Sequence, residues 1–199
     1  MASALEKLLL KKLKVIPNFP KKGIQFQDIF SLVSDPTCQK KIVEKIAGYA
    51  RKNSITKIAG IEARGFIFGS LVAYKLNIPF VPIRKKGKLP GKVNKIKYKL
   101  EYGFDQIEMQ DGSLKKQDKV LIVDDLIATG GTALASSKLI SKMGVKSIFF
   151  AFVINLYNLK GVRLLEKNKY SYLFFSNNLT PFRLYRFCLL YTSPSPRDS

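Results

Sequence analysis

A buried strand that runs into two carboxylates and a glycine-threonine turn is the feature that most constrains the fold of this chain. Residues 120–123 are Val-Leu-Ile-Val, and this aliphatic run predicts a strand over residues 120–124 that is covered on both faces, as in a parallel sheet. Asp124 and Asp125 follow it, and residues 128–132 form an Ala-Thr-Gly-Gly-Thr turn. Apolar residues then recur at helical spacing, at Leu134, Leu139, Ile140 and Met143. The stretch therefore predicts a strand, a turn and a helix in succession.

The predicted turn has the properties of a site for a phosphate monoester. Gly130 and Gly131 allow backbone N–H groups to approach an anion closely, and the hydroxyl groups of Thr129 and Thr132 add donors. The helix that starts here contributes partial positive charge at its N-terminus. We therefore expect the turn that begins at Ala128 to bind a phosphate group.

The two carboxylates suit a sugar attached to that phosphate. Asp124 and Asp125 would repel the phosphate itself, but carboxylates are strong acceptors for vicinal hydroxyl groups such as those of ribose. A hydrated magnesium ion carried by the substrate fits the same place, because Mg²⁺ keeps several waters and takes one or two carboxylates. The alternative is a solvated Asp-Asp pair before a helix cap, and the turn at residues 128–132 favours the sugar site over it.

The composition is that of one globular domain without the commonest catalytic groups. The chain has 199 residues, of which 46% are hydrophobic, and no apolar run approaches the roughly 18 residues of a membrane span. Cys38 and Cys188 lie far apart without metal-ligand spacing, which supports neither a disulfide framework nor a zinc site. Histidine is absent, so acid or base chemistry must use carboxylates, Lys or Tyr. Because neither a membrane span nor a disulfide framework is indicated, we expect an intracellular, cytoplasmic protein.

The net charge of +21 does not by itself indicate which class of partner the protein binds. The 35 basic residues against 14 acidic ones suit a nucleic-acid binder, a membrane-surface protein or an enzyme with very anionic substrates. Most of the basic residues are lysines spread along the whole chain, which favours a general compositional bias over a binding surface.

Helical and strand-like segments alternate along most of the chain. An apolar stripe from Leu5 to Ile16 predicts an N-terminal helix ended by Pro17, and Asp35-Pro36 predicts the capped start of a helix that runs to about Asn53. Strand-like runs follow at residues 57–61, 79–84, 120–124, 147–154 and 171–175. This alternation predicts an α/β domain whose mainly parallel sheet binds ligands at the carboxyl ends of its strands.

The composition changes near the C-terminus. From Thr180 onward there is no Lys, and the end of the chain, from Ser193 to Ser199, shows no periodicity. We therefore predict a folded domain over residues 1–178 and interpret residues 179–199 as a non-native or disordered extension.

Residues 120–132 resemble the phosphoribosyl pyrophosphate signature of the type I phosphoribosyltransferases. Further segments resemble the adenine phosphoribosyltransferases of that family, namely residues 16–29, 62–69, 81–91 and 100–103. The resemblance covers about residues 5 to 176 and keeps the family's order and spacing. It implies a single α/β domain with a central, mainly parallel sheet, flanking helices and a mobile flap.

The resemblance also implies which residues hold the pyrophosphate. Arg64 follows a predicted strand and starts a helix, so its guanidinium and the nearby N–H groups can clamp pyrophosphate oxygens. Further contacts to the pyrophosphate or its magnesium are implied for Arg84, Lys85 and Lys88. The alternatives are a surface Arg at a helix start and, for any single Lys, a solvated side chain.

The flap and the base site complete the implied machinery. Residues 85–99 contain seven lysines and no acid, which favours a mobile basic flap. The resemblance implies that Glu101 and Tyr102 fold over the substrates, where a carboxylate can stabilise cationic charge in a site that excludes water. It also implies that Phe26 stacks on adenine, whereas Gln27 stands where the family carries Arg, which places base affinity or the flap contact in question.

These expectations combine into one predicted activity. The resemblance implies transfer of the 5-phosphoribosyl group from phosphoribosyl pyrophosphate to adenine, giving AMP and pyrophosphate in purine salvage, with Mg²⁺ and as a homodimer. Neither a membrane nor a nucleic-acid partner is favoured. Two alternatives are the same fold acting on hypoxanthine or guanine, and a noncatalytic regulator that senses phosphoribosyl pyrophosphate and binds nucleic acid.

Overall fold

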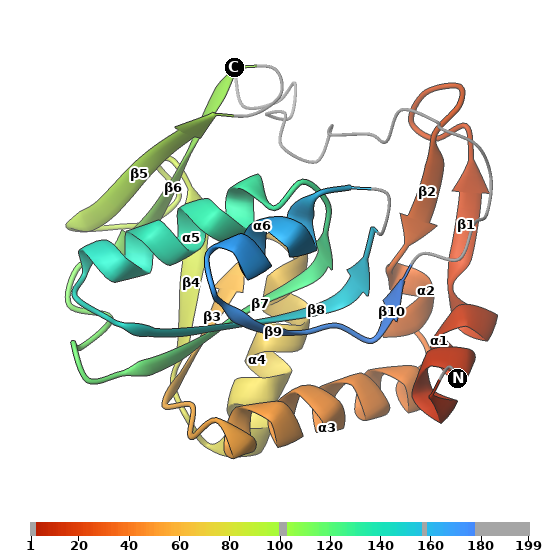
Figure 1. Cartoon of the computed structure of the whole chain (residues 1–199), viewed down its shortest axis with the longest axis horizontal. Coiled ribbons are helices and arrows are strands. Elements are labelled where there is room, and N and C mark those ends of the chain that lie inside the picture. Colours follow the sequence, from red (N-terminus) through yellow and green to blue (C-terminus); the bar gives the residue numbers. More distant parts are fainter. Residues whose placement is uncertain (1–2, 100–102, 157–158, 178–199) are drawn as a thin grey trace.

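A central sheet of eight strands organises the computed structural model, which describes residues 3–99, 103–156 and 159–177. Its strand order is β10-β8-β7-β3-β4-β6-β5, and β9 also pairs with β8 (Figure 1). The strands are β3 Lys57–Ile61, β4 Phe80–Lys85, β5 Val93–Lys99, β6 Phe104–Gln110, β7 Lys119–Ile127, β8 Ser147–Asn155, β9 Ser171–Leu173 and β10 Ser176–Asn177.

Most of the sheet is parallel, as the alternation of helices and strands predicts. β7 is parallel to both of its neighbours, β3 and β8, and β4 is parallel to β3. β9 and β10 also run parallel to β8, whereas β5 and β6 form an antiparallel pair that joins β4 through β6. The predicted fold class is therefore confirmed. β7 lies inside the sheet, where β3 pairs with it as far as Val123 and β8 continues beside it to Ile127.

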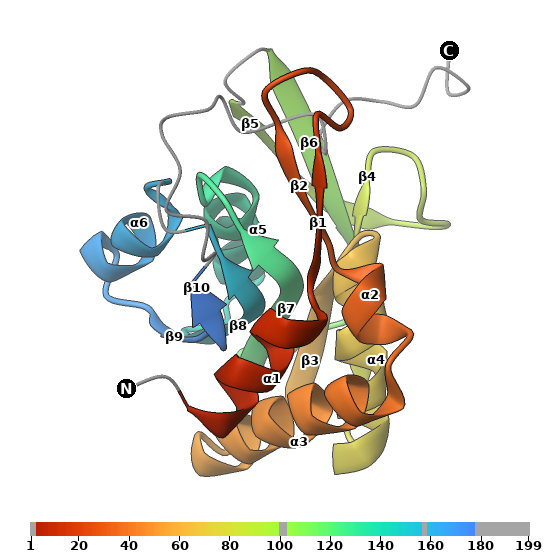
Figure 2. The ribbon, with the colours of Figure 1, turned by 90° about the vertical axis from the view of Figure 1, so that its right-hand side faces the viewer.

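Helices cover both faces of this sheet. α4 Arg64–Leu76 lies on one side of β7, and α5 Gly131–Lys142 and α6 Gly161–Lys167 lie on the other side (Figure 2). Alternate residues of β7 supply both cores, since Leu121 packs on the α4 side while Val120 packs on the α5 side. This two-sided burial is the reason that β7 is continuously aliphatic before its first carboxylate.

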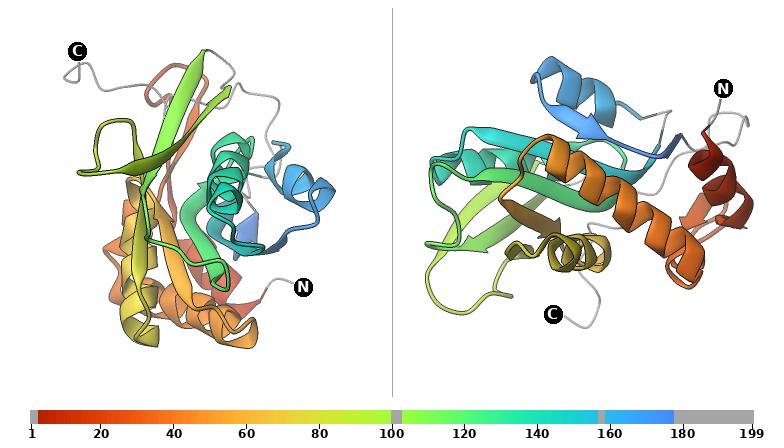
Figure 3. Two further views of the ribbon diagram at one scale, coloured as in Figure 1. Left: turned by 90° about the vertical axis from the view of Figure 1, so that its left-hand side faces the viewer. Right: turned by 90° about the horizontal axis from the view of Figure 1, so that it is seen from below.

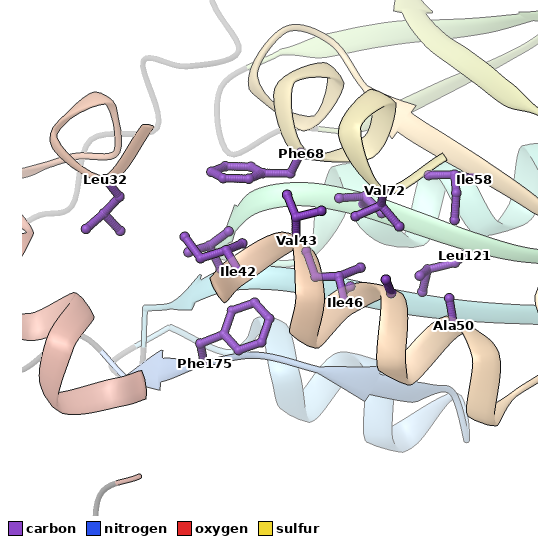
Figure 4. Packing of buried hydrophobic residues seen from close by; sticks show 14 of the residues in the cluster. Leu32, Ile42, Val43, Ile46, Ala50, Ile58, Phe68, Val72, Leu121 and Phe175 are labelled. Carbon is purple, nitrogen blue, oxygen red and sulfur yellow. The ribbon is translucent and has the colours of Figure 1, made fainter. Parts of the chain in front are cut away.

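Helix α3 Pro36–Lys52 follows its predicted cap. The Asp35 side chain accepts a hydrogen bond of 3.0 Å from the backbone N–H of Cys38, and Pro36 occupies the first turn. Its buried residues, Ile42 and Ile46 among them, pack against α4 and the sheet (Figure 4). The predicted helix and its buried face are confirmed.

The N-terminal prediction is wrong after residue 12. α1 Ala4–Lys12 ends before the predicted stop at Pro17, and β1 Lys14–Pro17 pairs antiparallel with β2 Gln25–Asp28 before the short helix α2 Phe30–Val33. The β-branched pair Val15 and Ile16 lies in this strand and stays exposed, so pairing with β2 overrides the helical spacing. The β1–β2 hairpin lies on the side to which the parallel strands point (Figures 1 and 2).

Other boundaries also differ from the sequence prediction. β7 continues to Ile127, so the two carboxylates lie within the strand. The strand predicted at 171–175 ends at Leu173 as β9, and β10 starts beyond the predicted range, at Ser176. The predicted flap segment contains the regular strand β5, which pairs with β6 along its whole length beside α5 (Figure 3). Residues 178–199 lie outside the described residues, so the predicted domain boundary at 178 stays a prediction.

Over the described residues, none of the helices combines the length and the apolar character that crossing a bilayer requires.

Candidate active site

The turn between β7 and α5 has the backbone geometry of an anion cradle. Gly130 has a φ of 80°, which favours glycine, and it stands at the N-cap of α5, whose first residues are Gly131 and Thr132. The first backbone N–H groups of α5 therefore start at the predicted phosphate site, at the positive end of the helix. The predicted succession of strand, turn and helix is confirmed, and the role of the turn as a phosphate cradle stays a prediction.

The start of α6 supports this cradle from behind. The N–H of Gly161 donates to the carbonyl of Ala128 at 3.0 Å, and a Cβ at Gly161 would lie only 2.4 Å from that oxygen. A Cβ at Gly130 would lie 3.0 Å from the Gly161 Cα. Sequence reasoning missed Gly161, because its partner lies in a distant segment and no local pattern marks a glycine that is needed for close backbone contact.

The two carboxylates of β7 have different surroundings. The Asp125 side chain is buried, and the backbone N–H of Asp125 donates to Oδ1 of the partly buried Asp124 at 2.9 Å. Burial and the neighbouring Asp125 raise the pKa of Asp124 well above that of an ordinary carboxyl group. Burial also raises the pKa of Asp125, although the positive charge of Arg64 opposes this rise. Hydroxyl donors or a cation beside Asp124 and Asp125 would favour the ionised form of these carboxyl groups.

Arg64 lies against this pair. Its Nε is 2.9 Å from Oδ2 of Asp125, and that oxygen accepts no hydrogen bond from the residues that the structure describes, so the contact is an ion pair. The side chains are 15% and 2% exposed, so water screens this pair weakly. The structure thus brings together three predicted catalytic residues, Arg64, Asp124 and Asp125.

Gly65 makes this approach sterically possible. A Cβ at Gly65 would lie 2.4 Å from the carbonyl oxygen of Val123 and 3.2 Å from Oδ1 of Asp124. The N-terminus of α4 therefore packs directly on the backbone of β7, which is what places Arg64 beside Asp125.

Arg84 and Lys85 lie at the end of β4, as predicted, but the guanidinium of Arg84 is engaged by the protein. It donates to both oxygens of Glu62, at 3.1 and 3.0 Å, and to the carbonyl of Lys88 at 2.7 Å. The N–H of Lys85 also donates to Glu62. Burial disfavours the Glu62 carboxylate, but these donors outweigh it and lower its pKa. Sequence reasoning missed Glu62, which the fold pairs with a side chain on the neighbouring strand.

The predicted base site lies in the β1–β2 hairpin. Phe26 of β2 packs edge to face on Phe19, with ring centroids 5.0 Å apart, and is partly buried. The Gln27 side chain is 6% exposed, and its Oε1 makes no hydrogen bond within the described part of the chain. The side chain that replaces the family's Arg thus points into the protein and not into solvent.

Comparison with known proteins assigns this arrangement to a family. Residues 33–191 match the model of the phosphoribosyl transferase domain. The chain belongs to the phosphoribosyltransferase family. It is 48% identical over 158 residues to adenine phosphoribosyltransferase from Clostridium botulinum, with 79% of this chain and 92% of the relative covered.

Solved structures agree with this membership. The phosphoribosyltransferase is similar to the adenine phosphoribosyltransferase of Rhodothermus marinus, with a TM-score of 0.80 at 39% identity over 87% of this chain and 98% of that one. It is also similar to the Saccharomyces cerevisiae enzyme in complex with an imino-altritol bisphosphate and adenine, with a TM-score of 0.79 at 35% identity over 86% and 98% of the two chains.

Two predicted residues of this phosphoribosyltransferase, Glu101 and Tyr102, lie outside the described residues. The roles assigned to the other site residues stay predictions, although the structure gathers the cradle, the carboxylate pair and Arg64 at one end of β7.

Proposed function

We propose that this phosphoribosyltransferase transfers the 5-phosphoribosyl group from phosphoribosyl pyrophosphate to adenine and releases AMP and pyrophosphate. The observation that carries the proposal is the continuous β7 segment, in which a carboxylate pair leads directly into a glycine-threonine cradle at a helix N-terminus. The chain also aligns with adenine phosphoribosyltransferases over about nine-tenths of the length of those relatives.

Each part of the site has one task in this reaction. The cradle from Ala128 to Thr132 binds the 5-phosphate through backbone N–H groups and hydroxyls. Asp124, which is less buried than Asp125, accepts hydrogen bonds from the ribose hydroxyls. As the bond between the anomeric carbon and pyrophosphate breaks, positive charge develops on the ribose, and the adjacent carboxylates stabilise it. Arg64, which lies beside the carboxylate pair, is the guanidinium proposed to bind the departing pyrophosphate.

The site suits a magnesium ion that is bound mainly to the substrate. The described residues contain no group of three or more acidic, Cys or His side chains that could hold a metal ion on their own. Because Asp125 is paired with Arg64, Asp124 is the carboxylate that remains to receive a hydrated Mg²⁺ whose other ligands are substrate oxygens. When bound, the ion supplies positive charge that stabilises the departing pyrophosphate.

The base is held by the hairpin that carries Phe26. We propose that Phe26 stacks on adenine. Near the pyrophosphate we propose three basic residues, Arg84, Lys85 and Lys88. Arg84 acts there mainly by holding the segment from Lys85 to Lys88 in place through its hydrogen bonds to Glu62 and to the Lys88 carbonyl. Glu101 and Tyr102 are proposed to cover the substrates. A homodimer and a cytoplasmic role in purine salvage are also proposed, on the family resemblance alone.

A competition among free bases tests the assignment of adenine. The purified protein is given phosphoribosyl pyrophosphate, Mg²⁺ and equal concentrations of adenine, hypoxanthine and guanine, and the nucleotides formed are separated. We expect AMP to be the main product and chelation of Mg²⁺ to stop its formation. IMP or GMP as the main product would move the assignment to another purine, and no nucleotide together with salt-sensitive nucleic-acid binding would favour the regulator.

A further inference from the structure

Tyr98 connects the β5–β6 pair to the phosphate cradle. Its hydroxyl oxygen is 3.2 Å from Oγ1 of Thr132, in the first turn of α5, and 3.4 Å from Oδ2 of Asp105, its cross-strand partner on β6. α5 packs on β5, so this contact joins two elements that otherwise meet through apolar side chains such as Ile96. The sequence motifs that predict the site do not include Tyr98.

The Tyr98 hydroxyl keeps its proton at neutral pH. Burial, together with the negative charges of Asp105 and Asp124, raises the pKa of Tyr98 to about 12. Tyr98 therefore has one proton to donate, and Thr132 has one as well. Either oxygen can be the donor in the contact between them.

A phosphate in the cradle removes this ambiguity. If Thr132 donates to a phosphate oxygen, its own oxygen can only accept from Tyr98, because each hydroxyl carries a single proton. Without phosphate, Thr132 can instead donate to Tyr98, and Tyr98 can donate to Asp105. The direction of the hydrogen bond between Tyr98 and Thr132 is therefore coupled to phosphate binding at Thr132.

We propose that Tyr98 is a positioning residue for the 5-phosphate, which donates to Thr132 and so directs the Thr132 hydroxyl toward the phosphate. The inference rests on the proposed function, in which Thr132 is a phosphate ligand. The bound anion strengthens the donation from Tyr98, since linked hydrogen bonds polarise one another in a partly buried site.

The binding of ribose 5-phosphate tests this role directly, because this probe occupies the cradle but not the base site. Tyr98→Phe keeps the aromatic ring and removes the hydroxyl, so we expect a melting temperature close to that of the wild type. The dissociation constant for ribose 5-phosphate and the KM for phosphoribosyl pyrophosphate should each rise about tenfold, while kcat changes less than about twofold.

A matched control is available at Tyr172. Its hydroxyl also donates to a carboxylate, that of Glu166 at 2.6 Å, and its pKa is likewise raised to about 12. Tyr172 lies on β9, however, and Glu166 is near the last residue of α6, whereas Gly161 at the first residue contacts the cradle. Tyr172→Phe should leave both constants unchanged. An equal effect of both substitutions would overturn the inference.

A double-mutant cycle with Thr132→Val separates this inference from the proposed function. We expect Tyr98→Phe to have almost no further effect on ribose 5-phosphate binding once the Thr132 hydroxyl is removed. Additive effects, or a Tyr98→Phe variant that binds like the wild type while Thr132→Val binds more weakly, would overturn the role of Tyr98 and leave the cradle intact. Unchanged binding by Thr132→Val would instead reject Thr132 as a phosphate ligand, and the role of Tyr98 with it.

Discussion

Asp125→Asn should lower kcat for AMP formation by about a hundredfold or more, since it removes a preorganised charge from the reacting centre. Asp125 is buried and forms the ion pair with Arg64, so the substitution also removes the negative charge that faces this cation. Steady-state kinetics with saturating adenine and phosphoribosyl pyrophosphate measure the effect.

Asp118→Asn is the control for this substitution. Asp118 is also buried and also lies near a cation, with Lys57 at 3.4 Å, but it precedes the first residue of β7, at the opposite end of the strand. This variant should lose stability and keep its kcat. If Asp125→Asn retained wild-type turnover, the charge role of the carboxylate pair would be wrong.

Gly65→Ala should destabilise the protein and abolish most of its activity. The new Cβ would lie 2.4 Å from the carbonyl oxygen of Val123, and this backbone atom cannot move without disturbing the hydrogen bonds of the sheet. The N-terminus of α4 must then shift, at a cost near the upper end of the roughly 1–3 kcal/mol typical of overpacking. For a chain of this size, that cost corresponds to a melting temperature lower by about 5–10 °C. Activity falls as well, because Arg64 moves with the helix end.

Gly48→Ala separates this steric effect from the general effect of adding a methyl group to a helix. Gly48 is an exposed residue of α3, and a Cβ there would meet no atom within 4 Å. The substitution should raise the free energy of unfolding by roughly 0.5–1 kcal/mol, since Gly is a poor helix former. Calorimetry and kinetics on both variants make the comparison. A Gly65→Ala protein with wild-type stability and activity would refute the close packing of α4 on β7.

The β7–α5 unit could be predicted from sequence because its signals are local. The aliphatic run, the carboxylates and the glycine turn lie within thirteen consecutive residues, 120–132, and agree on one strand, one turn and one helix. β1 could not be predicted in the same way. Its helical apolar spacing is real, but the outcome is set by pairing with β2, which the spacing does not encode.

Side-chain partners were harder to predict than elements. Arg64 and Arg84 are both predicted at the pyrophosphate, and the sequence did not indicate that the fold pairs Arg64 with Asp125 and Arg84 with Glu62. Position in the sequence gives the edge of the sheet at which a cation emerges, but not the carboxylate that it meets there. Gly161 shows the same limit, since its need for close contact arises only when α6 packs behind the cradle.

Formation of AMP by the purified protein tests the central claim most directly. The protein is mixed with adenine, phosphoribosyl pyrophosphate and Mg²⁺, and AMP and pyrophosphate are quantified together. If the protein transfers the phosphoribosyl group to adenine, we expect equal amounts of AMP and pyrophosphate, and neither should accumulate when adenine is omitted. Binding of phosphoribosyl pyrophosphate without any AMP would contradict the claim, because the cradle would then serve recognition and not transfer.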